Sequence, residues 1–239
     1  MADHPRYIDT ANLPRAFFDN AAKTGEKPLF FAKRDGAWHG TGWDLVALSV
    51  RRLAGALIAA GITPHDRVIV SAENRPEWAI ADLAIMAIGA IVVPAYTTNT
   101  EDDHHYIMEH SGAVAIITSG GLLASRLALA ATRAPQIGMM TVMDPDSEVS
   151  VPATIAVHHW SDIMANTPPL ADLDAHIDAI DSDDTCCLVY TSGTGGRPKG
   201  VMLTHRSIQA CITASIEILQ EGNVADNQRF LSLLPLSCL

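Results

Sequence analysis

Apolar residues recur every three or four positions over residues 46–57, and this spacing predicts an α-helix with one apolar face. The stripe consists of Val46, Val50, Leu53 and Leu57. Thr41 and Asp44 stand before it with the Thr-x-x-Asp spacing of a helix start, and Gly61 ends the pattern. We therefore expect a helix between about residues 41 and 61, packed against a sheet.

Short aliphatic runs alternate with helical patterns in the next hundred residues. We expect helices from 74–76 to about residue 89, at 101–110 and at 122–132, and strands at 67–71, 91–93, 114–118 and 139–143. Strands that are apolar on both faces and joined by helices indicate a doubly wound, mainly parallel α/β sheet with flanking helices.

This alternation stops at 144–184, where turn-forming residues predict loops and connecting segments. We place a subdomain boundary near residue 180, so that 1–180 form a first α/β subdomain and 181–239 begin a second, incomplete one. In the second part we expect a loop at 191–199, and the flanking elements are a strand at 186–190, a helix along 208–219 and a strand at 230–234.

Composition narrows the functional classes. The chain has 239 residues, 48% of them hydrophobic, and a formal net charge of -11, which makes binding to a nucleic-acid backbone a poor hypothesis. The longest apolar run, 83–93, has 11 residues and falls short of the roughly 20 that span a bilayer. The chain has no signal-peptide pattern and no C-x-x-C pair, so we expect a cytoplasmic protein. The sequence is also compatible with peripheral contact to a membrane.

The stretch from Tyr190 to Gly200 contains the residues most suited to chemistry. Six successive positions hold three glycines and three hydroxyl residues, namely Thr191, Ser192, Gly193, Thr194, Gly195 and Gly196. Such a loop lets backbone N–H groups approach an anion, and Lys199 adds a positive charge that can neutralise a departing pyrophosphate. The spacing fits neither the Walker A loop nor the dinucleotide fingerprint. The alternative is a solvated connection between two strands.

This stretch closely resembles the signature of the adenylate-forming superfamily, Tyr-Thr-Ser-Gly-Thr-Thr-Gly-x-Pro-Lys-Gly, and differs only at Gly195. Other segments are also similar to this superfamily, and 71–78 and 233–237 resemble its long-chain fatty-acyl-CoA synthetase branch in particular. In that branch a histidine follows Leu-Pro-Leu-Ser, whereas this chain has Cys238. The resemblance implies the N-terminal part of the large domain of such an enzyme.

The resemblance also implies a reaction and a set of site residues. A carboxylic acid, in this branch a long-chain fatty acid, attacks the α-phosphate of ATP, and coenzyme A then displaces AMP. The residues at 191–196 together with Lys199 match the loop that grips the β- and γ-phosphates, Lys199 being the expected catalytic residue. Thr191 is the expected Mg²⁺ contact, and Ser237 and Cys238 match the acyl and adenylate pocket.

Several motifs of the superfamily belong downstream of residue 239, so we expect this chain to be an N-terminal fragment without synthetase activity of its own. The alternative is a non-catalytic truncated remnant that at most binds nucleotide phosphates or a partner chain. Reading the coding DNA beyond residue 239 separates the two hypotheses.

Other reactive side chains have simpler interpretations. We expect His104, His105, Glu109 and His110 to form an exposed polar helix face rather than a metal site, because their spacing matches neither zinc motif. Cys186 and Cys187 are expected to be buried and unreactive. We expect 158–160 to lie on a loop surface and His205 to begin a helix.

Overall fold

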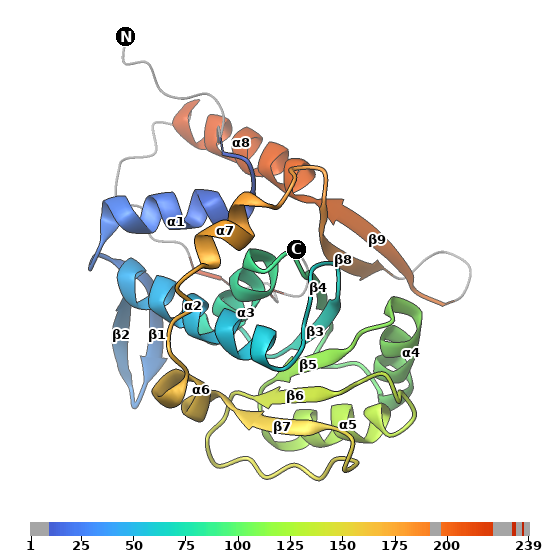
Figure 1. Cartoon of the computed structure of the whole chain (residues 1–239). Coiled ribbons are helices and arrows are strands. Elements are labelled where there is room, and N and C mark those ends of the chain that lie inside the picture. Colours follow the sequence, from blue (N-terminus) through green and yellow to red (C-terminus); the bar gives the residue numbers. More distant parts are fainter. Residues whose placement is uncertain (1–9, 192–196, 222–230, 233–235, 237–239) are drawn as a thin grey trace.

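The computed structural model describes residues 10–191, 197–221, 231–232 and 236. Their centre is a seven-stranded sheet with the order β7-β6-β5-β3-β4-β8-β9 (Figure 1). The strands are β3 (Arg67–Ser71), β4 (Ile91–Pro94), β5 (Ala115–Thr118), β6 (Met139–Val142), β7 (Ala156–His159), β8 (Thr185–Thr191) and β9 (Lys199–Thr204). Every pairing from β7 to β8 is parallel, and β9 runs antiparallel to β8. The predicted mainly parallel α/β sheet is therefore confirmed.

Helices cover both faces of this sheet. Helices α2 (Trp43–Ala59) and α3 (Pro76–Ala87) pack on one face together with α1 (Leu13–Thr24), and α4 (Glu101–Ser111) and α5 (Gly121–Ala131) pack on the other. The strands between them are buried on both faces, which explains why they read as continuous aliphatic runs. Helix α8 (His205–Glu221) follows β9.

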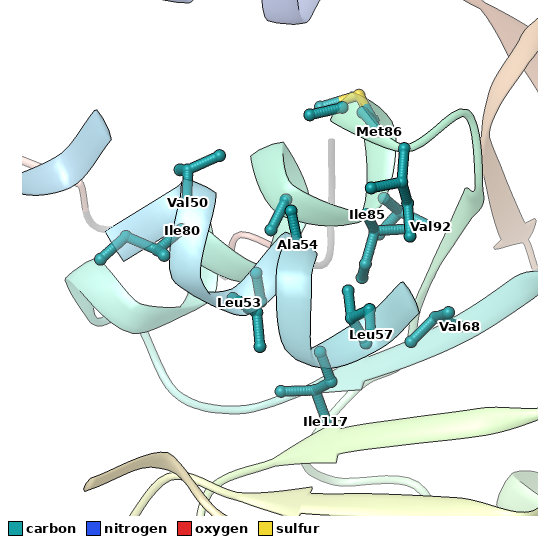
Figure 2. Packing of buried hydrophobic residues seen from close by; sticks show 14 of the residues in the cluster. Val50, Leu53, Ala54, Leu57, Val68, Ile80, Ile85, Met86, Val92 and Ile117 are labelled. Atoms are coloured by element: carbon teal, nitrogen blue, oxygen red, sulfur yellow. The ribbon is translucent and has the colours of Figure 1, made fainter. Parts of the chain in front are cut away.

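The stripe predicted from the sequence lies at the centre of the first core. Val46, Val50, Leu53 and Leu57 on α2 have no exposed surface. In Figure 2 the labelled side chains of α2 and α3 lie in one cluster with Val68, Val92 and Ile117 of the sheet. Burying a side chain of this size contributes about 1.5–3 kcal/mol, so this layer is a main source of stability.

The predicted start of α2 was wrong. Thr41 belongs to β2 (Ala37–Gly42), which pairs with β1 (Pro28–Arg34) in a separate antiparallel hairpin. Gly42 is the N-cap residue and forms no side-chain capping bond. The Asp44 carboxylate accepts the N–H of Leu45 instead. The helix thus begins directly where a strand ends, without a Thr-x-x-Asp capping box.

Residues 144–184 contain more regular structure than predicted. Besides β7, they form α6 (Trp160–Asn166) and α7 (Leu173–Asp178). The α7 residues Leu173 and Ile177 are fully buried in the first core. The expected boundary near residue 180 stays a prediction, and β8, which follows it, pairs with β4 in the same sheet. The expected strand at 230–234 lies mostly outside the described residues, and Leu231 and Ser232 are not in a strand.

Candidate functional site

The candidate site lies at the turn of the β8–β9 hairpin. Strand β8 runs parallel to β4, so its last residue, Thr191, reaches the carboxyl edge of the sheet, where ligands of open α/β sheets bind. Thr191 is paired directly with Lys199 at the start of β9, and both side chains are exposed. The structure therefore brings together two of the predicted site residues from opposite ends of the glycine-rich segment.

The remaining predicted site residues cannot be placed. Ser192, Gly193, Thr194, Gly195 and Gly196 lie outside the described residues, as do Ser237 and Cys238. Their expected contacts to phosphate and to the acyl and adenylate pocket stay predictions.

The described flanks of the loop have the chemistry that a polyphosphate needs. Lys199 supplies a cation and Thr191 a hydroxyl on adjacent strands at one edge. Among the described residues there is no group of three acidic, histidine or cysteine side chains that could hold a metal ion. A site with a single hydroxyl, such as that of Thr191, is compatible with Mg²⁺. This ion keeps several waters and commonly binds through substrate phosphates with only one or two protein oxygens.

Helix α4 holds the far flank of the loop, a contact that the sequence did not reveal. The Tyr106 hydroxyl donates a hydrogen bond of 2.9 Å to the Pro198 carbonyl. The Arg197 guanidinium lies over the Tyr106 ring, with its carbon 5.3 Å from the ring centroid. One side chain of α4 therefore contacts two successive residues of the predicted phosphate loop.

The same helix also holds the near flank. His110 Nδ1 lies 2.8 Å from the hydroxyl of Tyr190, which is buried and directly precedes Thr191. Burial, together with the neighbouring Tyr106, raises the pKa of Tyr190 to about 12, so its hydroxyl stays protonated at neutral pH. Gly200 lies opposite Tyr190 in the pairing, and an added Cβ there would lie only 3.0 Å from Leu188 Cδ1 and in ordinary contact with the Tyr190 ring at 3.4 Å.

The predicted exposed histidine face on α4 was therefore wrong in part. His104 has no exposed surface, and burial lowers its pKa to about 4, because the charged imidazolium is disfavoured away from water. His105 pairs with the exposed Glu109 at 3.4 Å, and His110 is exposed but contacts Tyr190. His105 and Glu109 face each other, and within the described residues no three of the four side chains are grouped as metal ligands. That they form no metal site stays a prediction.

A second group of contacts ties the end of the chain to the same edge of the sheet. The Asn74 amide donates to the Ser232 carbonyl and hydroxyl at 3.3 Å, and its oxygen accepts the Leu236 N–H at 2.9 Å. Asn74 stands between β3 and α3 in the segment that resembles the fatty-acyl branch. Leu236, the one residue of its motif that the structure describes, is thereby placed beside this segment.

The remaining predictions about individual side chains have mixed outcomes. Cys186 and Cys187 are buried as predicted, and burial raises the pKa of the Cys186 thiol to about 12. His205 begins α8, and its Nδ1 accepts the Leu13 N–H at 3.3 Å. The predicted loop surface at 158–160 was wrong, because His158 and His159 end the edge strand β7 and Trp160 is buried at the start of α6.

In the part of the chain that the structure describes, no helix combines the length and the apolarity needed to cross a membrane.

The fold matches solved structures of acid-activating enzymes. A benzoate CoA ligase from Burkholderia xenovorans superposes with a TM-score of 0.65 at 22% identity, over 82% of this chain and 35% of that chain. The adenylation domain of a carboxylate reductase from Mycobacterium chelonae gives a TM-score of 0.68 at 17% identity, over 84% of this chain and 36% of that chain. At such identities the match shows the fold alone.

Curated relatives match by sequence. Long-chain-fatty-acid–CoA ligase FadD15 of Mycobacterium tuberculosis is 30% identical over 95% of this chain and 36% of its own length. Long-chain-fatty-acid–CoA ligase ACSBG2 of Xenopus laevis is 27% identical over 96% of this chain and 32% of its own length. The chain thus spans about a third of the length of these relatives. The family model described as AMP-binding enzyme matches residues 17–239, and the chain therefore belongs to the AMP-binding enzyme family.

Proposed function

We propose that this chain supplies the phosphate-binding part of an ATP-dependent acid–CoA ligase that activates a fatty acid. The observation that carries the proposal is the pairing of Thr191 with Lys199 at the carboxyl edge of the sheet, on either side of the signature loop. The names of the relatives, long-chain-fatty-acid–CoA ligases, support the choice of acid.

The proposed reaction has two steps. A carboxylate oxygen of the fatty acid attacks the α-phosphorus of ATP, the bond to the bridging oxygen breaks, and pyrophosphate leaves. The thiol of coenzyme A then adds to the carbonyl carbon of the acyl-adenylate, loses its proton, and AMP departs. Bound Mg²⁺ would supply further neutralisation of phosphate charge, with the Thr191 hydroxyl as the proposed protein contact.

Within this reaction, Lys199 has the role that the described geometry supports best. Lys199 is the first residue of β9, it is paired with Thr191 at the carboxyl edge, and its side chain is exposed. A fixed positive charge near the β- and γ-phosphates stabilises the negative charge that develops on the leaving pyrophosphate. The residues at 192–196 are proposed to add backbone N–H and hydroxyl donors. A cytoplasmic location, with peripheral contact to membranes that hold the acid, is part of the proposal.

Titration calorimetry with MgATP tests the phosphate-binding role. We expect the wild-type chain to bind MgATP weakly and the Lys199→Ala variant to lose about tenfold or more in affinity, since a charge-assisted hydrogen bond contributes about 1.5–3 kcal/mol. Lys33→Ala, on the separate β1–β2 hairpin, is the matched control and should bind as the wild type does. Equal affinity in the wild type and Lys199→Ala would contradict the assignment.

The alternative of a non-catalytic remnant has specific support in Gly195 and Cys238, where this chain departs from the signature residues of the family. The coding DNA after residue 239 decides between the two. The enzyme proposal predicts that the remaining motifs follow in frame, and that the 239-residue chain alone forms no acyl-CoA. Acyl-CoA formation by this chain alone would overturn the second of these predictions.

A further inference from the structure

We propose that helix α4 braces the phosphate loop at both of its ends, with Tyr106 and His110 as positioning residues that set the loop for nucleotide binding. This inference rests on the proposed function of the loop, but it concerns residues outside the signature. Tyr106 holds Arg197 and Pro198 after the glycine-rich segment, and His110 holds Tyr190 before it.

The two contacts form one continuous cluster of rings. The Tyr106 and His110 rings lie one helical turn apart, with centroids separated by 5.3 Å. The Tyr190 ring meets both of them edge-on, at 6.3 Å from Tyr106 and 5.6 Å from His110. Aromatic pairs favour this edge-to-face arrangement over face-to-face stacking. A shift of α4 would therefore disturb both flanks of the loop together.

Helix α4 is fixed well enough to serve as a brace. At its start, Thr100 and Asp103 form a reciprocal capping box, and at its end Gly112 adopts a left-handed conformation. Arg67 of β3 donates to the carbonyls of Ser111 and Gly112 at 2.7 and 2.6 Å. Both ends of the helix are thus tied down, and the end nearest His110 is joined to an inner strand of the sheet.

The loop, by contrast, lies on a hairpin at the edge of the sheet, where one of its two strands has a single neighbour. Strand β9 has β8 as its pairing partner and no further neighbour in the described sheet order. A glycine-rich loop loses much conformational entropy when it grips a ligand. Fixing both flanks beforehand reduces this loss, which is the general way in which preorganisation increases affinity.

Two substitutions of Tyr106 separate its contacts. Tyr106→Phe removes the hydrogen bond to the Pro198 carbonyl and keeps the ring beneath Arg197, whereas Tyr106→Leu removes both. We expect hydrogen exchange of the peptide 191–199 to accelerate about fivefold in the first variant, the equivalent of one ordinary hydrogen bond, and more in the second. MgATP affinity should fall in the same order, because a looser loop loses more conformational entropy on binding.

Two histidines of the same helix supply the matched comparison. His110→Ala removes the contact to Tyr190, whereas His105→Ala removes the contact with Glu109 at 3.4 Å and no contact with the loop flanks that the structure describes. We expect faster exchange at 191–199 and weaker MgATP binding in His110→Ala alone. A merely structural role of Tyr106 and His110 would instead lower the thermal midpoint and accelerate exchange in β5 and β6 as well.

The proposal is overturned if exchange at 191–199 is the same in the wild type and Tyr106→Leu, or if the wild-type peptide already exchanges at the rate of an unstructured chain. Absence of MgATP binding to the wild type would refute nucleotide binding by this chain, but the exchange measurement would still decide whether α4 braces the loop.

Discussion

The inner strands and the edge strand β9 belong to one sheet but differ in burial. All residues of β5 and β6 are buried, between α2 and α3 on one face and α4 and α5 on the other. In β9, by contrast, no residue is buried, and Met202 is 71% exposed. The inner part therefore provides stability, whereas β9 and the loop that precedes it carry the proposed phosphate-binding role.

The edge position fits the phosphate-binding role that we propose for the loop. A glycine-rich turn inside the packed strands would leave voids and unpaired backbone groups. At the edge, the described residues on either side of the loop are held by two residues of a neighbouring helix. Substitutions in the two regions should consequently affect different measurements.

The largest effect on stability is expected from Leu53→Ala in α2. The Leu53 side chain has no exposed surface, and its truncation should lower the free energy of unfolding by about 2–5 kcal/mol through lost burial and a new cavity. Urea denaturation followed by circular dichroism measures the change. Leu45→Ala on the same helix is the control, because Leu45 is 55% exposed and its truncation should cost less than about 0.5 kcal/mol. Equal losses of stability in the two variants would contradict the assignment of Leu53 to the packed core.

Acid should weaken the junction between α8 and α1. Burial lowers the pKa of His205 to about 4, below the roughly 6.5 of an unfolded histidine. The unfolded chain therefore binds the proton first, and the stabilisation, complete above about pH 6.5, is lost as the pH falls toward 4.

The measurement is the free energy of unfolding at pH 7 and pH 5. Between these values His205 should account for a loss of about 1–2 kcal/mol. In His205→Gln the difference in unfolding free energy between pH 7 and pH 5 should shrink by that amount. The difference due to the buried His104, whose pKa is also about 4, should remain. An unchanged slope would show that His205 is protonated equally in both states.

An opposite pH dependence is expected from Asp82 on α3. Burial raises the pKa of Asp82 to about 7, and its charge also disfavours ionisation of Cys186 on β8. Since the unfolded carboxyl titrates near 3.9, the folded chain keeps the proton longer, and stability falls as the pH rises from about 4 to 7. Asp82→Asn should thus raise the free energy of unfolding at pH 8, by up to about 4 kcal/mol, with no gain at pH 4. A gain that is equal at both pH values would have another cause.

The smallest effect on stability is expected at the edge strand. Met202→Ser should change the free energy of unfolding by less than about 0.5 kcal/mol, because the side chain is already in water. It should instead reduce self-association at high concentration, since exposed apolar edge strands pair with other chains. Sedimentation velocity measures this. Met140→Ser, in the fully buried β6, is the comparison, and it should lower the free energy of unfolding strongly. A large loss of stability in Met202→Ser would show that β9 is packed in solution.

The sequence predicted the parallel core because its elements are long or strongly apolar. Helix α2 has a complete apolar stripe, and the inner strands are aliphatic throughout. Helices α6 and α7 were missed because 7 and 6 residues give too few turns for a helical period. The edge strand β7 was missed because its Ala-Val-His-His sequence is partly exposed and mixed in polarity.

At the site, the signature predicted the loop and Lys199 but none of the contacts that hold the loop. Tyr106 and Pro198 are 92 positions apart, and no local pattern relates them. His110 was assigned to an exposed polar face because it follows charged residues, and its side chain is indeed exposed. Only the parallel pairing of β4 with β8, which brings α4 beside the hairpin, gives this histidine its neighbour.

Because β9 runs antiparallel to β8, the two strands are joined by a short loop, whereas β8 joins the sheet through a residue far away in the sequence. Thr191 and Lys199, which flank the loop, are 8 positions apart, whereas Val92 and Cys187, which join the hairpin to the sheet, are 95 positions apart. Closing a short segment costs little chain entropy and takes microseconds or less, while distant pairings form slowly. The hairpin that carries the proposed phosphate loop can therefore fold as a local unit before it reaches the sheet, and its docking onto α4 is the later event.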